Sequence, residues 1–160
     1  MSLIPAADLA KASGPHSRRA LEYSYVMKGL VEKAKDPAFT SADWAPLAAL
    51  VDTENFERIG NFKEKVNWEQ YDDLLTMWGK ATVWDFDVRR VTEGDGYCIL
   101  ELAEHATYPD RHDDYNSVSV YQFNDAGKLV HLDIYLQLAQ RIDEAQAHSW
   151  DWQEVSAEIV

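Results

Sequence analysis

The chain has 160 residues, a length that fits one domain and lets a folded chain bury roughly two-thirds of its unfolded surface. Hydrophobic residues make up 46% of it and aromatic residues 12%, which excludes an intrinsically disordered chain. A formal charge of −13 repels phosphate backbones and anionic lipids, so we expect no nucleic acid and no membrane among its partners.

Cysteine content and hydropathy limit the cross-links, targeting segments and membrane spans that the chain can contain. Cys98 is the only cysteine, so an intramolecular disulfide and a thiolate metal cluster within one chain are excluded. Residues 1–11 contain neither a basic n-region nor a long apolar run, and no stretch of roughly 18 apolar residues occurs. We expect no signal peptide, no membrane span and a cytoplasmic location. Because repeats and low-complexity linkers are missing from the sequence, residues 1–160 are expected to form a single domain.

The first predicted helix covers about residues 17–35. Leu21, Tyr25 and Val31 recur at helical spacing, and Asp36-Pro37 ends the pattern.

Two further helices and a short strand follow. Residues 40–43 resemble a capping box, which predicts a second, shorter helix after them. Residues 55–59 alternate in polarity and end at Gly60, which predicts a half-buried strand. Residues 68–78 place their large aromatic side chains on one face, which predicts a third helix that Gly79 can cap.

The second half of the chain alternates with a period of two and predicts an antiparallel meander. Tight turns are expected at 93–96 and 124–127, and a polar loop at 109–116. The strands are expected at 83–89, 97–105, 117–123 and 128–137. Residues 139–160 alternate less clearly and are expected to form a C-terminal extension or flap.

This order of elements over residues 17–138 resembles the nuclear-transport-factor-2-like superfamily, which includes ketosteroid isomerases, SnoaL-like polyketide cyclases and scytalone dehydratase. The segments that carry the resemblance are 47–52, 68–79 and 124–135. The resemblance implies an α+β fold in which a cone-shaped, curved antiparallel sheet wraps around N-terminal helices, a cystatin-like α+β barrel. It also implies a cavity between the sheet and the first helix, and a homodimer or higher homo-oligomer formed through the outer sheet face. Val118, Val120 and Trp84 are candidate contacts of that oligomer.

Arg58 stands where the resemblance places the base of ketosteroid isomerases, with Glu57 beside it. A guanidinium stays protonated and cannot serve as a base. We therefore expect Arg58 to bind an anionic substrate oxygen, and the alternative is a strand arginine paired with Glu54 or a nearby acid at the rim.

Three further residues are candidates for the chemistry. Tyr25, with Tyr23 as the competitor, lies where the resemblance places a helix tyrosine that donates a hydrogen bond to a developing oxyanion. The alternative is that either tyrosine is part of the core. His105 shares a strand face with Glu101 and is a neutral base candidate, and Asp133 is a second one; the alternatives are a structural or surface histidine and a solvated or interface acid.

We expect no metal and no cofactor. His105 and His112 lie near Asp110, Asp113 and Asp114, but their spacing fits neither a zinc finger nor a calcium loop, so a solvated acidic loop is the preferred interpretation. The pair Gly94 and Gly96 fits a hairpin turn rather than a phosphate-binding loop.

The resemblance implies a cofactor-independent lyase or isomerase that acts on a small aromatic or polyketide-like compound by proton abstraction or elimination. Arg58 and Tyr25 would hold the substrate oxygen, and His105 or Asp133 would move the proton. Further substrate contacts are expected from Tyr23, Phe56, Trp68, Trp84, Glu101, Tyr121 and Tyr135. The alternatives are a non-catalytic small-molecule-binding or assembly domain, and an epoxide hydrolase-like enzyme in which Asp133 or Asp87 would stand beside Arg58.

Overall fold

The computed structural model of the chain describes residues 3–138, so the expected extension or flap at 139–160 lies outside the described residues. The helical elements of the described part are α1 (Ala6–Leu9), α2 (Pro15–Lys33), η1 (Ser41–Trp44), α3 (Ala45–Ala48) and α4 (Trp68–Ala81). The first and third predicted helices are confirmed as α2 and α4, and the second is a 3₁₀ turn followed by one short α-helix. No helix within residues 3–138 combines the length and the apolar character needed to cross a bilayer.

The start of α4 shows how the sequence fixes a helix boundary. The side chain of Asn67 accepts a hydrogen bond of 2.9 Å from the backbone N–H of Gln70, and the Gln70 side chain accepts one of 3.0 Å from the N–H of Asn67. This reciprocal capping box satisfies two N–H groups that have no partner inside the helix.

The start of α2 is capped from another part of the chain. Gly14 precedes the helix and has no side chain to cap it, but Glu93 at the end of β3 (Val83–Gly94) reaches this position. The backbone N–H and the hydroxyl of Ser17 donate hydrogen bonds of 2.8 and 2.5 Å to the same carboxylate oxygen of Glu93. A negative charge at a helix N-terminus is favourable, so this contact ties the first helix to the sheet.

The sheet has six strands in the order β2-β1-β6-β5-β4-β3 and does not close on itself. Its further strands are β1 (Glu57–Ile59), β2 (Lys65–Val66), β4 (Tyr97–Thr107), β5 (His112–Phe123) and β6 (Leu129–Leu138). The strands from β3 to β6 form the predicted antiparallel meander. The short β1 pairs with β6 in parallel, so the sheet is mixed.

One boundary predicted from the sequence is wrong. The polar loop expected at 109–116 is only a tight turn, closed by a hydrogen bond of 2.8 Å from the N–H of Tyr108 to the carbonyl of Arg111. β5 begins at His112, because residues 112–116 continue the ladder with β4, where His112 pairs with Thr107 and Asn116 with Ala103. Their polarity reflects an exposed strand end rather than a loop.

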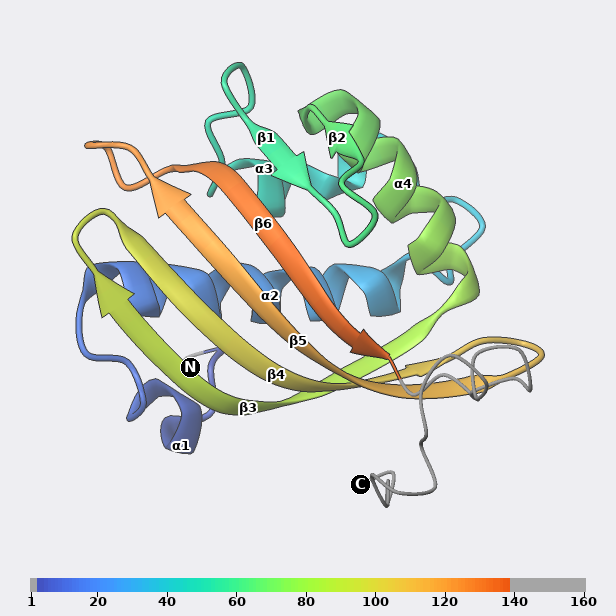
Figure 1. Ribbon diagram of the computed structural model, residues 1–160. Helices are drawn as coiled ribbons and strands as arrows, with labels where there is room; N and C mark the ends of the chain where they lie inside the picture. Colours follow the sequence, from blue (N-terminus) through green and yellow to red (C-terminus); the bar gives the residue numbers. More distant parts are fainter. Residues whose placement is uncertain (1–2, 139–160) are drawn as a thin grey trace, which may run out of the picture.

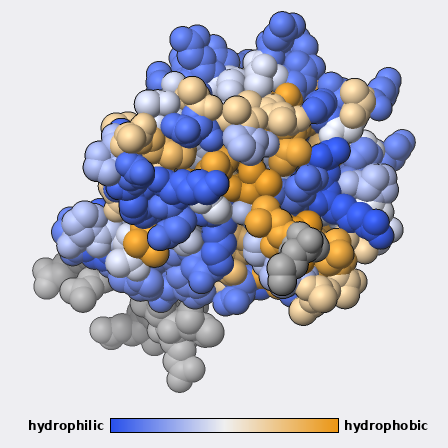
Figure 2. All heavy atoms as spheres, turned by 180° about the vertical axis from the view of Figure 1, so that it is seen from behind, coloured by the Kyte–Doolittle hydropathy of each residue, from blue (hydrophilic) through white to orange (hydrophobic). Residues whose placement is uncertain are grey.

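The strands curve along one side of α2, and α4 lies beside the β1–β2 end of the sheet (Figure 1). A register shift between Val88 and Arg90 interrupts the β3–β4 ladder, a feature that bends and twists strands. The inward face of β4 carries Leu100, Leu102 and Ala106, all buried against the helices. Seen from the helix side, hydrophobic residues gather near the middle of the surface, where α2 runs, and hydrophilic residues surround them (Figure 2).

Candidate functional site

Arg58 lies in the middle of β1 and faces the concave side of the sheet. Its register partner on β6 is Leu132, which is 1% exposed, and partners in a ladder share a face. The guanidinium carbon lies 5.0 Å from the ring centroid of Tyr71, and Nη1 lies 3.3 Å from Oε1 of Glu64. The side chain is 16% exposed. Arg58 is therefore mostly buried, and its charged group lies over the face of the Tyr71 ring.

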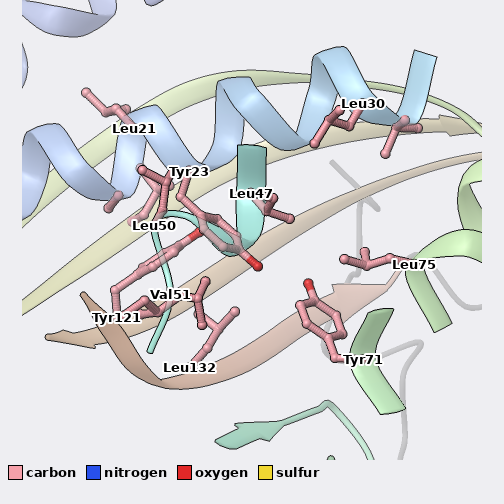
Figure 3. Packing of buried hydrophobic residues seen from close by; sticks show 14 of the residues in the cluster. Leu21, Tyr23, Leu30, Leu47, Leu50, Val51, Tyr71, Leu75, Tyr121 and Leu132 are labelled. Atoms are coloured by element: carbon pink, nitrogen blue, oxygen red, sulfur yellow. The ribbon is translucent and has the colours of Figure 1, made fainter. Parts of the chain in front are cut away.

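Tyr23 is the tyrosine of α2 that enters the interior. It is 2% exposed, and its ring meets that of Tyr121 edge to face with centroids 5.7 Å apart. The Tyr121 hydroxyl lies 3.4 Å from the hydroxyl of Ser24. The hydroxyl groups of Tyr23 and Tyr71 point toward the same interior region between α2 and α4 (Figure 3). Burial, the main cause, raises the pKa of both Tyr23 and Tyr121 well above the ordinary value, so both phenols stay protonated donors.

Two buried donors of this cluster, the hydroxyl of Tyr23 and Nε of Arg58, make no hydrogen bond of ordinary geometry among the described residues. The hydroxyl of Tyr71 is nonetheless close enough to that of Tyr23 to contribute to its raised pKa. The positive charge of Arg58 slightly opposes the rise in the pKa of Tyr23. Because buried polar atoms are nearly always hydrogen-bonded, two such donors on the same face of the sheet favour a site for an oxygen-bearing ligand or ordered water.

An aromatic wall stands beside Arg58. The ring centroids of Phe56 and Trp68 are 5.6 Å apart, and those of Phe56 and Tyr71 are 5.8 Å apart. These rings come from the loop before β1 and from the first turns of α4. An apolar wall next to a guanidinium and phenol donors is a combination that fits a flat organic molecule carrying an oxygen.

Glu104 is a carboxylate on the concave face. It is 9% exposed, and its Oε2 accepts a hydrogen bond of 2.7 Å from the indole Nε1 of Trp84. Its charge adds to the main effect of burial in raising the pKa of Tyr115, its register partner on β5, and it also contributes to the raised pKa of Tyr121. The charge of Glu104 therefore acts on the hydroxyl groups of Tyr115 and Tyr121.

Several of the predicted site residues lie on the inner side of the molecule, although Trp84 lies at the other end of the strands from Arg58. Tyr23, Phe56, Arg58, Trp68, Trp84 and Tyr121 lie on the concave side or under the helices. Tyr25 lies at the flank of α2, where its ring packs on Phe86 at 5.0 Å and its hydroxyl donates to the carboxylate of Asp8. Of the two tyrosines considered for the same role, Tyr23 therefore points inward and Tyr25 does not.

The other predicted residues lie on the outer face of the sheet. His105 contacts Asp114 at 2.6 Å, a hydrogen bond that is the main cause of its raised pKa. Asp133 contacts His131 at 3.1 Å, and Glu101 pairs with Arg90 at 2.9 Å. Tyr135 is exposed on the same face. None of these four shares the face on which Arg58 lies.

One expected oligomer contact is wrong. Trp84 is 5% exposed and packs inward against Phe86, so it cannot contribute to a contact through the outer sheet face. Val118 and Val120 do lie on the outer face, since their neighbours Ser117, Ser119 and Tyr121 are buried on the inner one.

Tyr71 and Glu104 are site residues that were not predicted from the sequence. The signal for Glu104 is its place in β4: it falls on the same alternating face as Leu100 and Leu102, and a glutamate within an apolar face is unusual. The signal for the orientation of α2 is the spacing of Ser17, Ala20 and Ser24, small buried residues that let the helix approach the sheet.

Two hollows lie elsewhere on the surface. One, of about 330 Å³, is lined by residues such as Tyr97 and Gln122 at the β3–β4 turn. The other, of about 500 Å³, lies between the start of α2 and the turns after β3 and β5. Neither contains a predicted catalytic residue.

Solved structures with a similar fold are known, whereas sequence comparisons find no match. No protein-family model matches the sequence, and no curated protein matches it. A protein of Jannaschia sp. provisionally named a SnoaL-like polyketide cyclase matches with a TM-score of 0.58 at 12% identity, covering 79% of this chain and 90% of that one. A protein of Streptomyces galilaeus provisionally named a hydroxylase matches with a TM-score of 0.56 at 13% identity, over 76% and 90% of the two chains. An NTF-2 like protein of unknown function from Burkholderia xenovorans matches with a TM-score of 0.55 at 17% identity, over 92% and 99%.

Proposed function

We propose that this chain, which has the nuclear-transport-factor-2-like fold expected from its sequence, is a cofactor-independent lyase or isomerase acting on a small aromatic or polyketide-like compound. The fold rests on the structural likeness. The activity is argued from the interior site, because one fold of this kind hosts many activities.

The observation that carries the proposal is the pair of buried donors, the Tyr23 hydroxyl and Arg58 Nε, that make no hydrogen bond of ordinary geometry within residues 3–138. The Tyr23 hydroxyl points toward that of Tyr71, and the guanidinium of Arg58 lies over the ring of Tyr71 (Figure 3). A substrate oxygen that gains negative charge during the reaction would accept hydrogen bonds from both. Such preorganised donors stabilise an enolate or phenolate more strongly than they stabilise the neutral substrate.

Glu104 is the residue proposed to remove a proton from the substrate. The carboxylate would take a proton from a substrate carbon that is conjugated with the carbonyl, and the electron pair of the broken C–H bond would move through the conjugated bonds onto the oxygen held by Arg58 and Tyr23, because Glu104 lies six residues further along β4 than the row that contains Arg58. An isomerase would then return the proton to a different carbon, and a lyase would deliver it to a departing hydroxyl group, which leaves as water. His105 and Asp133 are less suitable for this role because they lie on the outer face.

A second candidate function is small-molecule binding without chemistry. It is favoured by the tight packing of Phe56, Trp68 and Tyr71 around Arg58, which gives a recognition surface whether or not a base is in reach. The epoxide hydrolase alternative has less support. It needs two aspartates beside Arg58, whereas Arg58 contacts Glu64, and Asp87 and Asp133 lie on the other face.

The test is turnover of a panel of aromatic diols and hydroxyketones by the wild-type chain and by Arg58→Met. The matched control is Arg90→Met, because Arg90 is an exposed arginine on the outer side of the sheet. We expect turnover by the wild type and the control, and a loss of at least about 100-fold in Arg58→Met. Binding without turnover would favour the second function, and equal rates in all three proteins would exclude Arg58 from the site.

A further inference from the structure

Two histidines and an aspartate converge on the outer face of the sheet, near the turn that joins β4 to β5. His105 lies near the end of β4, and Asp114 is its register partner on β5. His112 lies two residues before Asp114 on the same strand, so strand alternation places all three side chains on one face. The positions are therefore set by regular strand geometry.

The nitrogen and oxygen atoms of the three residues that could bind a metal ion lie close together. Nδ1 of His105 lies 2.6 Å from Oδ1 of Asp114, and Nε2 of His112 lies 2.9 Å from the same oxygen. One ligand atom from each of the three residues falls within 4.8 Å of the others. Ligands about 2.1 Å from a tetrahedral zinc ion are about 3.4 Å apart, so small rotations of these side chains suffice to share one ion.

The second nitrogen of each histidine also has a partner. Nε2 of His105 lies 3.4 Å from Oδ2 of Asp87, and Nδ1 of His112 lies 2.8 Å from the hydroxyl of Thr107. Histidines that bind metal ions commonly donate their remaining N–H to a carboxylate or another oxygen, which fixes the tautomer and aims the free nitrogen at the ion. Asp87 and Thr107 are placed to do this.

We propose that His105, His112 and Asp114 bind one divalent transition metal ion of the zinc type. Two imidazoles and one carboxylate favour such an ion over Mg²⁺ or Ca²⁺, which prefer sites built of oxygen atoms alone. All three side chains are partly exposed, so water completes the coordination. The net charge of −13 favours any cation near this surface.

The ion would clamp β4 to β5 and take no part in the proposed chemistry. Glu104 immediately precedes His105 on β4. Its side chain lies on the opposite face of the sheet, and its register partner is Tyr115. A metal ion on the outer face therefore holds the two strands together directly behind the proposed base. Metal binding at these three residues does not depend on whether the interior is catalytic.

The test is equilibrium dialysis of the full chain against Zn²⁺, with Mg²⁺ as a parallel probe, followed by metal analysis. We expect one zinc per chain, no comparable uptake of Mg²⁺, and a higher thermal unfolding temperature with zinc. His105→Gln, His112→Gln and Asp114→Asn should each weaken zinc binding by more than about 100-fold, and Thr107→Val by about 10-fold.

His131→Gln is the matched control. His131 lies on the same face and also contacts two carboxylates, but through different nitrogens: Nδ1 faces Glu57 at 3.4 Å and Nε2 faces Asp133 at 3.1 Å. We expect this variant to bind zinc like the wild type. No zinc uptake by the wild type, or equal uptake by the wild type and the three ligand variants, would overturn the site. Unfolding temperatures measured without zinc verify that every variant is folded.

Discussion

The indole of Trp84 donates a hydrogen bond of 2.7 Å to Glu104, and both side chains are buried on the concave face of the sheet. The bond crosses from β3 to β4 and holds one carboxylate oxygen in place. A buried acid that is oriented by one donor and has tyrosines in its electrostatic neighbourhood is a reasonable position for a proton-transfer group.

Exchanging this acid for an amide separates chemistry from structure. Glu104→Gln keeps an oxygen that can accept from Trp84, so we expect a folded protein whose turnover falls by about 10²- to 10⁴-fold. Glu101→Gln is the matched control on the same strand, since Glu101 lies on the outer face and pairs with Arg90. Steady-state rates for the two variants decide the matter, and equal rates would remove Glu104 from the mechanism.

The two tyrosines of α2 predict opposite effects on stability and binding. In Tyr23→Phe the free energy of unfolding should stay the same or rise by about 1 kcal/mol, because the lost hydroxyl makes no hydrogen bond of ordinary geometry in the described part of the chain. Ligand binding should weaken. In Tyr25→Phe the hydrogen bond to Asp8 is lost, so stability should fall by about 1 kcal/mol while ligand binding is unchanged. Denaturant unfolding and ligand titration of both variants test this crossed pattern.

The cap on α2 predicts a pH-dependent contribution to stability. Burial alone would raise the pKa of Glu93, but the hydrogen bonds from Ser17 lower it below its ordinary value of 4.5. When the pKa of an acid is lower in the folded state than in the unfolded state, the ionised acid stabilises the protein at every pH above the unfolded-state pKa. This stabilisation is lost as the pH falls through the folded-state pKa. We expect Glu93→Gln to cost about 1 to 3 kcal/mol at pH 7, with a difference from the wild type that shrinks below pH of about 4.5.

Denaturant unfolding of the wild type and Glu93→Gln across this pH range measures the effect. Glu54→Gln serves as the control, since Glu54 is exposed in the loop before β1. A Glu93→Gln difference that stays constant with pH would show that the carboxylate charge does not contribute.

Local chemistry made much of the fold predictable. The helix α4 could be placed because Asn67 and Gln70 form a capping box, and the β3–β4 hairpin because Gly96 adopts a positive φ of 76° in its turn. The strand pattern was recognisable wherever one face is apolar. It failed at His112–Asn116, where the strand end is exposed and its composition is that of a loop.

Long-range pairing accounts for what could not be predicted. The parallel contact that places Arg58 opposite Leu132 joins segments that are 74 residues apart in the chain, and no local pattern reports it. The convergence of His105 with His112 and Asp114 likewise depends on the register of two strands. The choice between Tyr23 and Tyr25 depends on the rotation of α2 about its axis, which the small residues Ala20 and Ser24 determine by packing.

β1, the strand that carries Arg58, is only three residues long and is flanked by the two-residue β2. With so few ladder bonds, its amide protons should exchange with deuterium much faster than those of β4 and β5 in the free chain. A molecule that engages Arg58 would bridge this segment to the rest of the interior. Slower deuterium uptake at residues 57–66 would then reveal occupancy even for a compound that is never converted.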